Sequence, residues 1–165
     1  MSAILTTLGL RAAAGQQPAN HAAGFLVGNW FLAFCFMSIR GEKMYYGLDH
    51  NDSPREDLSK YGERAVQEGK LSRRTLEKLK RKEAAHANAQ EGYPLFVAAM
   101  LLSLYAGLPN ETINGIGIWY TLSRVAYSFA YSYIDSPTVS YLRSVTWWSG
   151  NISCVTALVL AGKKL

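Results

Sequence analysis

The chain has 165 residues, of which 49% are hydrophobic and 18% charged, and its formal net charge is +5 at pH 7. This length suits one domain. The charges are segregated, because Asp, Glu, Lys and Arg are absent from residues 12–39, 92–110 and 144–162, and Arg124 is the only charge within 112–134. This pattern excludes an evenly charged soluble surface, and it excludes a disordered chain, which lacks long apolar runs. It indicates an integral membrane protein.

Four segments approach the roughly 20 apolar residues that a helix needs to cross a bilayer. They lie near 22–40, 86–107, 113–134 and 141–161. Short turns at 108–111 and 135–138 connect the last three, with Asn110 and Ser136 as the expected N-caps. Because both turns are short, these helices should be antiparallel neighbours. We therefore predict an all-α, four-helix membrane bundle formed by residues 1–165 as one domain.

The charged segment 43–85 is predicted to be a soluble loop that contains two short helices. The first begins at the capping box Ser53-Pro54-Arg55-Glu56, buries Leu58, Tyr61 and Ala65 on one face, and ends at Gly69. Ser72 is the expected cap of the second helix, which runs into the span at 86–107. Eleven of the 17 basic residues lie in this loop, so the positive-inside rule places it in the cytosol.

Location and partners follow from the same charges. The loop has 11 basic against 8 acidic residues, a net charge of +3 that argues against a nucleic-acid partner and favours a solvated face beside lipid headgroups. We expect a multi-pass protein of the endoplasmic reticulum membrane with lumenal termini. A mitochondrial membrane is the alternative, because residues 1–21 contain Arg11 and no acidic residue.

Known catalytic and metal-binding patterns are otherwise scarce. Two cysteines, Cys35 and Cys154, exclude a disulfide framework and a four-cysteine zinc site, and both lie in apolar runs that suggest buried free thiols. The three histidines are scattered, and no Ser-His-Asp or phosphate-loop pattern occurs. We expect no metal site.

Polar residues within the spans need a reason, since an ionisable group there costs at least ~2.5–3.5 kcal/mol. His86, Asn88 and Glu91 form the first cluster, in which Asn88 and Glu91 are three residues apart and are expected to share a helix face. Pro94 should kink the helix beside Glu91. Either these residues form a site within the span, or they belong to a solvated loop that precedes it.

The second cluster is a stripe on the third span, where Tyr120, Arg124, Tyr127 and Tyr131 are spaced by four, three and four residues. Tyrosine hydroxyls around a guanidinium suit an anionic ligand. The alternative is an aromatic belt combined with a packing seam.

The third cluster, Arg143 and Ser144, opens the fourth span, and Arg40 ends the first. On the predicted topology both arginines reach the same membrane face as Glu91. Each arginine alone is equally well explained by anchoring to headgroups, but their convergence with a carboxylate favours a shared site. Ser144 is a candidate hydrogen-bond donor, or it packs at the helix start.

Three motifs resemble the MAPEG superfamily, the membrane-associated proteins in eicosanoid and glutathione metabolism. They are AHANAQEGYPLFVAA (85–99), SRVAYSFAYSYI (123–134) and LRSVTWW (142–148). The last motif is close to the prostaglandin E synthase branch, and the microsomal glutathione transferases are the other near branch. The resemblance covers about residues 25–160. It implies a homotrimer of four-helix protomers with glutathione bound between neighbouring subunits.

The resemblance also implies residue roles. Arg143 would be the catalytic arginine that faces the glutathione sulfur, with Ser144 beside it. The residues that would hold glutathione are Arg40, His86, Asn88, Glu91, Arg124, Tyr127 and Tyr131, of which Arg40 matches least firmly. The implied activity is that of a glutathione-dependent transferase or peroxidase, in which the thiolate attacks a lipophilic electrophile that arrives from the bilayer.

Three positions depart from the family pattern. Many relatives have Arg where this chain has Ala84, some have Arg where it has Ala87, and the prostaglandin branch has Tyr where it has Trp147. Arginine at the first two positions would bind the glutathione carboxylates, and we expect Arg81 or Lys82 to supply this positive charge instead. These departures leave two alternatives to an enzyme, which are a non-catalytic lipid-binding regulator and a subunit of a membrane complex that docks through the charged loop.

Overall fold

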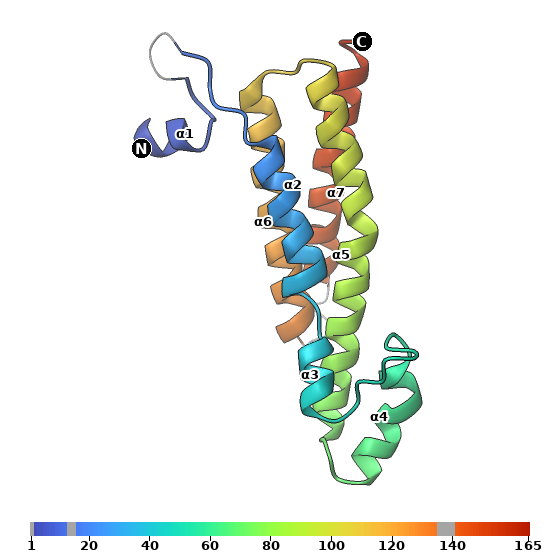
Figure 1. The fold of residues 1–165 in the computed structure, drawn as a ribbon. Coiled ribbons are helices and arrows are strands. Elements are labelled where there is room, and N and C mark those ends of the chain that lie inside the picture. The colour runs from blue at the N-terminus through green and yellow to red at the C-terminus, as the bar shows by residue number, and fades with distance from the viewer. Residues whose placement is uncertain (1, 13–15, 135–140) are drawn as a thin grey trace.

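The computed structural model describes residues 2–12, 16–134 and 141–165, and every regular element in these ranges is helical (Figure 1). The elements are α1 (Ser2–Thr7), α2 (Ala22–Phe31), the π-helical turn η1 (Leu32–Phe36), α3 (Arg40–Tyr45), α4 (Asp57–Gln67), α5 (Arg73–Tyr105), α6 (Asn110–Tyr133) and α7 (Tyr141–Gly162). The predicted turn at 135–138, with Ser136 as N-cap, lies outside the described residues.

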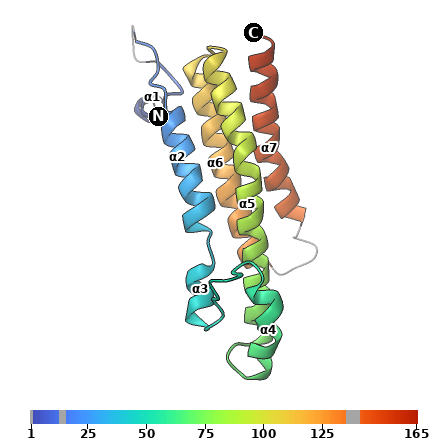
Figure 2. The same cartoon turned by 45° about the vertical axis from the view of Figure 1, so that its right-hand side comes forward.

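Helices α2, α5, α6 and α7 run side by side in both views (Figures 1 and 2). Helix α7 packs against α5 and α6, and α2 packs against the same two helices. Helices α3 and α4 lie at the end of this bundle opposite the C-terminus, beside the first turns of α5 (Figure 1). The charged loop therefore folds onto an extension of a bundle helix.

The turn between α5 and α6 is as short as the sequence predicts. Gly107 has a positive φ of 61°, and the amides of Gly107 and Leu108 donate to the carbonyls of Leu104 and Ser103, which is a Schellman motif. The predicted N-cap of α6 is wrong. Asn110 is already helical behind Pro109, and its side chain instead donates to the Pro18 carbonyl and accepts from Asn20.

The first apolar helix ends earlier than predicted. The helix that begins at Ala22 continues through η1 to Phe36, and Arg40 starts α3 instead of ending the first span. Close packing of α2 on α6 depends on Gly117, because a Cβ atom there would lie 2.3 Å from the ring of Phe25. The contact that Gly117 permits is therefore made within the chain.

Buried polar side chains on these helices are partnered across helix boundaries. Asn29 of α2 donates to the Thr121 hydroxyl of α6 at 2.8 Å, and Arg124 of α6 donates to Asn151 of α7 at 2.5 Å. Such bonds stabilise helix pairs where water is absent.

Two helical stretches, Ala22–Tyr45 and Tyr141–Gly162, are long and apolar enough to cross a membrane.

Helix α5 is continuous from Arg73 to Tyr105 and passes through Pro94 without interruption. The segment His86–Glu91 is therefore helical and not an irregular loop. Ser72 caps α5 as predicted, because its hydroxyl accepts from the Thr75 amide at 3.1 Å.

The α3–α4 module, residues 40–72, shares a small core with the first turns of α5, which contribute Leu76 and Leu79. Leu58 and Ala65 are buried and Tyr61 packs beside them, so the predicted face of α4 is confirmed, and α4 ends before Gly69, whose φ is +72°. The predicted capping box is wrong. Helix α4 begins at Asp57, and Ser53 donates to the carboxylate of Glu56 from a preceding turn.

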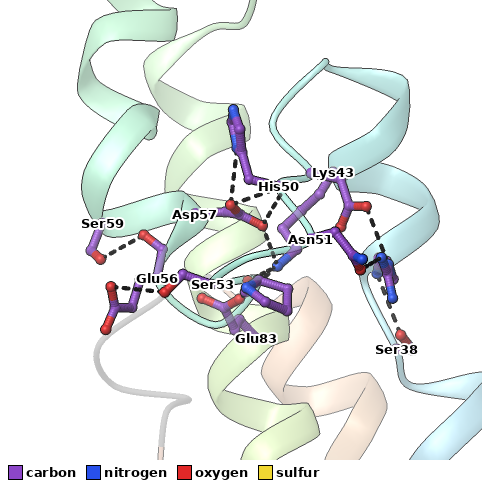
Figure 3. A network of polar contacts seen from close by, with 12 residues as sticks. Ser38, Lys43, His50, Asn51, Ser53, Glu56, Asp57, Ser59 and Glu83 are labelled. Atoms are coloured by element: carbon purple, nitrogen blue, oxygen red, sulfur yellow. Dashed lines mark hydrogen bonds and ion pairs between the residues drawn. The ribbon is translucent and has the colours of Figure 1, made fainter.

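Lys43 and Asp57 lie at the centre of a polar network that fastens this module to α5 (Figure 3). Lys43 Nζ lies 3.2 Å from Asp57 and 3.4 Å from Glu83 of α5, and it also donates to the Pro54 carbonyl. Asp57 further accepts from the backbone amide and contacts the ring Nδ1 of His50. Both Lys43 and Asp57 are buried, so each depends on the other for compensation of its charge.

Replacing Asp57 should loosen the module. Burial opposes ionisation of Asp57, but hydrogen bonds from Lys43 and His50 outweigh it and hold its pKa below the ordinary 3.8. Asp57→Asn leaves the Lys43 charge buried without its main partner, so we expect a loss of roughly 3 kcal/mol, measured as faster amide hydrogen exchange across α4. Asp52→Asn, an exposed change in the same loop, is the control, and equal exchange in both variants would contradict the role of the network.

The same pair predicts a pH dependence. A carboxyl group with a lowered folded-state pKa stabilises the fold at pH values above its unfolded pKa, and this contribution is lost as pH falls through the folded value. Protection of α4 should therefore persist down to about the 3.8 of a free Asp and decline below it. In Asp57→Asn this decline should be smaller, as measured by hydrogen exchange across a pH series.

Candidate functional site

Helices α5, α6 and α7 together build a small polar cavity at the end of the bundle nearest α3. It has a volume of about 180 Å³, and we call it the tyrosine cavity. Its lining residues are Asn88, Tyr127, Tyr131, Arg143, Ser144, Trp147 and Trp148. Five of these seven are residues that the sequence identified as candidates.

Direct contacts order this cavity. Asn88 of α5 donates to the Tyr127 hydroxyl of α6 at 2.7 Å, and the rings of Tyr127 and Tyr131 lie 5.3 Å apart. The Arg143 guanidinium lies 4.7 Å from the centre of the Tyr131 ring, a cation–π distance. The arginine is therefore held against the tyrosine pair by α6, although it belongs to α7.

Arg143 keeps donor capacity for a ligand. Its Nη2 donates to the carbonyl of Ile134, whereas its buried Nε makes no hydrogen bond within the described parts of the chain. A guanidinium supplies five donors in a fixed plane and remains charged at all relevant pH values. Ser144 lines the cavity beside it. The pair can therefore stabilise an anion that enters from the open side.

Trp147 and Trp148 form one wall, with ring centres 5.0 Å apart in an edge-to-face arrangement. From the sequence, Trp147 was recognisable only as a departure from the tyrosine of the prostaglandin branch, and Trp148 was not assigned to the site. The repeated Trp at the head of an apolar helix was the available signal.

A second, larger cavity of about 680 Å³ lies between α5 and the α3–α4 module, and we call it the loop-side cavity. It contains the remaining predicted residues Arg40, His86 and Glu91, together with Ala84 and Ala87. Arg40 donates to Asp49 at 3.2 Å and to Asn51 at 2.9 Å, so the module fixes its guanidinium at the edge. His86 lies 3.3 Å from the amide nitrogen of Gln90.

The structure separates Asn88 from Glu91. Asn88 lines the tyrosine cavity and Glu91 the loop-side cavity, because residues three apart on an α-helix are rotated by about 60° from one another. Arg143 and Glu91 accordingly line different cavities of a single chain. The candidate residues therefore form two separate half-sites along α5.

Three basic residues of the loop-side cavity were not assigned to the site from the sequence. Lys43, Arg55 and Lys80 line it together with Arg40 and thus place cations beside Ala84 and Ala87. Lys82, an expected substitute for the missing arginines, instead pairs with Glu42 and lines a different hollow. No spacing rule brings loop residues to a helix face, so the sequence offered no signal for Arg55.

Arg124 belongs to neither cavity. It is only 3% exposed, its guanidinium lies 4.8 Å from the Tyr120 ring centre, and it donates to Asn151 and toward the Trp147 carbonyl. A Cβ atom on Gly150 would lie 3.1 Å from its Nη2, so α7 approaches it closely. The tyrosine stripe is therefore divided, with Tyr120 and Arg124 in the packed interior and Tyr127 and Tyr131 in the cavity.

Comparison with known proteins agrees with these motifs. Searches of curated proteins and of solved structures gave no significant match. A family model, described as the MAPEG family, matches residues 18–163. The matched region contains every residue that lines either cavity. Because the match covers nearly the whole chain, the protein belongs to the MAPEG family.

Proposed function

We propose that the chain is a membrane-bound glutathione transferase or peroxidase that acts on lipophilic electrophiles. The observation that carries this proposal is the tyrosine cavity, where a cationic Arg143 with a free donor adjoins Ser144, Asn88 and two tyrosines. Membership of the MAPEG family supports the same class of chemistry. Glutathione would enter as a co-substrate.

The proposed topology has α2 with η1, the second part of α5, α6 and α7 as four membrane spans. Among the residues that the structure describes, two stretches are apolar enough by composition, and α5 and α6 are less apolar because they contain polar side chains. Outward-facing apolar side chains on α6 and α7, such as Leu122 and Val145, support contact of these helices with lipid or with a second chain. The α3–α4 module would lie in the cytosol, at the endoplasmic reticulum membrane.

The chemistry follows from the charge of Arg143. A free thiol with a pKa near ~8.5 is only a few per cent ionised at pH 7. A guanidinium within hydrogen-bond distance in a partly dehydrated site favours the thiolate, and Ser144 would donate a second hydrogen bond to the sulfur. The thiolate would then add to an activated double bond, so that a C–S bond and a C–H bond replace the π bond. With a hydroperoxide, attack on oxygen would break the O–O bond and give an alcohol and the sulfenic acid of glutathione, which a second glutathione would convert to the disulfide and water.

Two chains are proposed to complete each site. The tyrosine cavity, at about 180 Å³, is smaller than the roughly 300–1,000 Å³ typical of small-molecule sites. Glutathione has two carboxylates and an ammonium group, and the groups that suit these charges, Arg40, Arg55 and Glu91, line the loop-side cavity. In a homotrimer, the tyrosine cavity of one chain could lie against the loop-side cavity of the next chain. The combined site would then contain the groups that bind the sulfur and the groups that bind the charged ends of glutathione.

A lipid-binding regulator without catalysis is the second candidate. The observation that favours it is that Ala84 and Ala87 both line the loop-side cavity, where arginines would bind the glutathione carboxylates. In that case the cavities would hold a lipid, and glutathione would not bind.

Arg143→Ala tests the catalytic proposal. We expect conjugation and peroxidase turnover to fall at least a hundredfold, because removal of one electrostatic stabiliser of a developing charge costs about that much. The measurement is glutathione-dependent turnover of purified, reconstituted protein. Arg64→Ala, which removes an exposed arginine paired only with Glu68, is the matched control. Full activity of Arg143→Ala would refute the assignment.

Calorimetry separates the enzyme from the regulator. We expect wild-type protein to bind glutathione and Asn88→Ala to bind it about tenfold more weakly, because the orienting bond to Tyr127 is lost. Thr156→Val on the outer face of α7, whose hydroxyl bonds within its own helix, is the control. Absence of glutathione binding to the wild-type protein at millimolar concentration would favour the regulator.

Complementation between two inactive variants tests the shared site. Arg143→Ala disables one half-site and Glu91→Gln the other, and each should be inactive alone. When the two variants are co-expressed, random assembly should restore about one quarter of wild-type turnover, because one in four interfaces receives two intact halves. If each site lay within one chain, the mixed oligomers would remain inactive.

A further inference from the structure

A crevice next to the loop-side cavity, with which it shares Ser38 and Ile39, contains none of the residues that we assign to glutathione. It has a volume of about 180 Å³ and lies between η1, α3, α5 and α6. Its polar lining residues are Ser38, Glu42, Lys82, Ser128 and Ser132, and the exposed rings of Phe129 and Tyr133 border it. We call it the headgroup crevice.

The two serines of α6 in this crevice differ from several other hydroxyls of α6 and α7. Thr121, Ser153 and Thr156 each donate to a carbonyl three or four residues earlier, at 2.7–2.8 Å, as hydroxyls in apolar helices commonly do. Ser128 and Ser132 make no hydrogen bond within the described parts of the chain. Two adjacent turns of α6 therefore present free hydroxyls to one hollow.

The charges of the crevice form a single mixed pair. Lys82 of α5 contacts the carboxylate of Glu42 of α3, and the two side chains remain 19% and 43% exposed. A ligand that carries both an anionic and a cationic group can pair its anion with Lys82 and its cation with Glu42, so that two ion pairs replace one. A singly charged anion would bring its charge close to Glu42.

An apolar groove adjoins the crevice. It has a volume of about 510 Å³ and is lined by Ala126, Phe129, Ala130, Tyr133, Ile134 and Leu142. Phe129 and Tyr133 line both hollows, and their rings stack at 5.8 Å. The polar crevice and the apolar groove thus meet along one aromatic wall.

The depth of this wall suits the edge of a bilayer. Lys78 lies 5.0 Å above the Tyr133 ring, and Lys78 and Lys82 belong to the charged start of α5, whereas Phe129 and Leu142 belong to the apolar segments. Tyrosines and lysines gather at the level of lipid headgroups. The polar hollow would lie among headgroups, with the apolar groove beside the acyl chains.

We propose that the headgroup crevice binds one phosphatidylethanolamine molecule of the surrounding bilayer. Lys82 and the hydroxyls of Ser128 and Ser132 bind its phosphate, Glu42 accepts from its ammonium group, and an acyl chain lies in the groove beyond Phe129 and Tyr133. The inference rests on the proposed membrane location and is independent of glutathione chemistry.

Native mass spectrometry tests this site. The full-length oligomer is reconstituted into nanodiscs that contain equal amounts of phosphatidylethanolamine, phosphatidylcholine and phosphatidylglycerol, released, and scored for retained lipid. We expect phosphatidylethanolamine to be retained over phosphatidylcholine, whose quaternary ammonium cannot donate to Glu42. Preferential retention of phosphatidylglycerol, or no preference, would overturn the proposal.

Two variants locate the lipid. Lys82→Met and the double change Ser128→Ala with Ser132→Ala should each retain phosphatidylethanolamine about tenfold less than wild type, because charge-assisted hydrogen bonds to the phosphate are lost. Lys60→Met on α4 and Thr156→Val on α7 are the matched controls for charge and hydroxyl. Retention equal to wild type in both crevice variants would place the lipid elsewhere and refute the site.

Turnover distinguishes this inference from the proposed function. Each crevice variant that assembles as wild type by size exclusion should keep glutathione-dependent turnover, since none of its changes lies in either cavity. Wild-type protein that turns over glutathione but retains no phosphatidylethanolamine refutes only the lipid site. Protein that retains the lipid but neither binds nor turns over glutathione refutes only the proposed function.

Discussion

The packing of the helices depends on hydrogen bonds between buried polar side chains of neighbouring helices, which have little access to water. An unpaired polar group in such surroundings costs several kcal/mol, which favours packing that brings polar side chains of neighbouring helices together. The bond between Arg124 and Asn151 joins α6 to α7, and the bond between Asn29 and Thr121 joins α2 to α6. These contacts determine which faces of the helices meet. The polar side chains that take no part in these helix–helix contacts include those that line the two cavities.

The long helix α5 determines how the candidate groups are divided. It carries Asn88 toward the tyrosines of α6 and Glu91 toward the module that Lys43 and Asp57 fasten. The two side chains are about 60° apart around the helix, and the packing of α6, α7 and the module places them in different cavities. A composite site between chains uses both flanks, which gives the proposed oligomer a chemical purpose beyond stability.

Much of this arrangement could be predicted from the sequence, because charge segregation and helix-capping signals are local. The absence of charge from 12–39 and 144–162 located two apolar helices, and Ser72 and Gly69 marked ends that the structure retains. Local signals failed where a competing partner was distant in the chain. Asn110 is drawn from its predicted cap to the Pro18 carbonyl, more than ninety residues away.

The sequence identified most residues of the candidate site, but it did not show which of them line the same cavity. The spacing on the third span and the family motifs both identified Tyr127 and Tyr131, which the fold brings together with Arg143. Both also included Arg124, which the fold places in the packed interior instead. Arg124 lies outside the tyrosine cavity because it bonds to Asn151 and because Gly150 lets α7 approach it closely. Neither contact can be recognised from the sequence, since both depend on how α6 packs against α7. The cations around Ala84 and Ala87 likewise come from a loop whose path only tertiary packing determines.

Glu83, which Lys43 contacts, and Asn88, which Tyr127 contacts, lie five residues apart on an uninterrupted part of α5. A continuous hydrogen-bond ladder of this kind transmits force as a stiff rod and offers no hinge. The pairs of Lys43 with Asp57 and with Glu83 therefore hold the α3–α4 module against a stiff part of α5. Entry of a reactant from the bilayer would depend on side-chain rotation or on small sliding movements between neighbouring protomers.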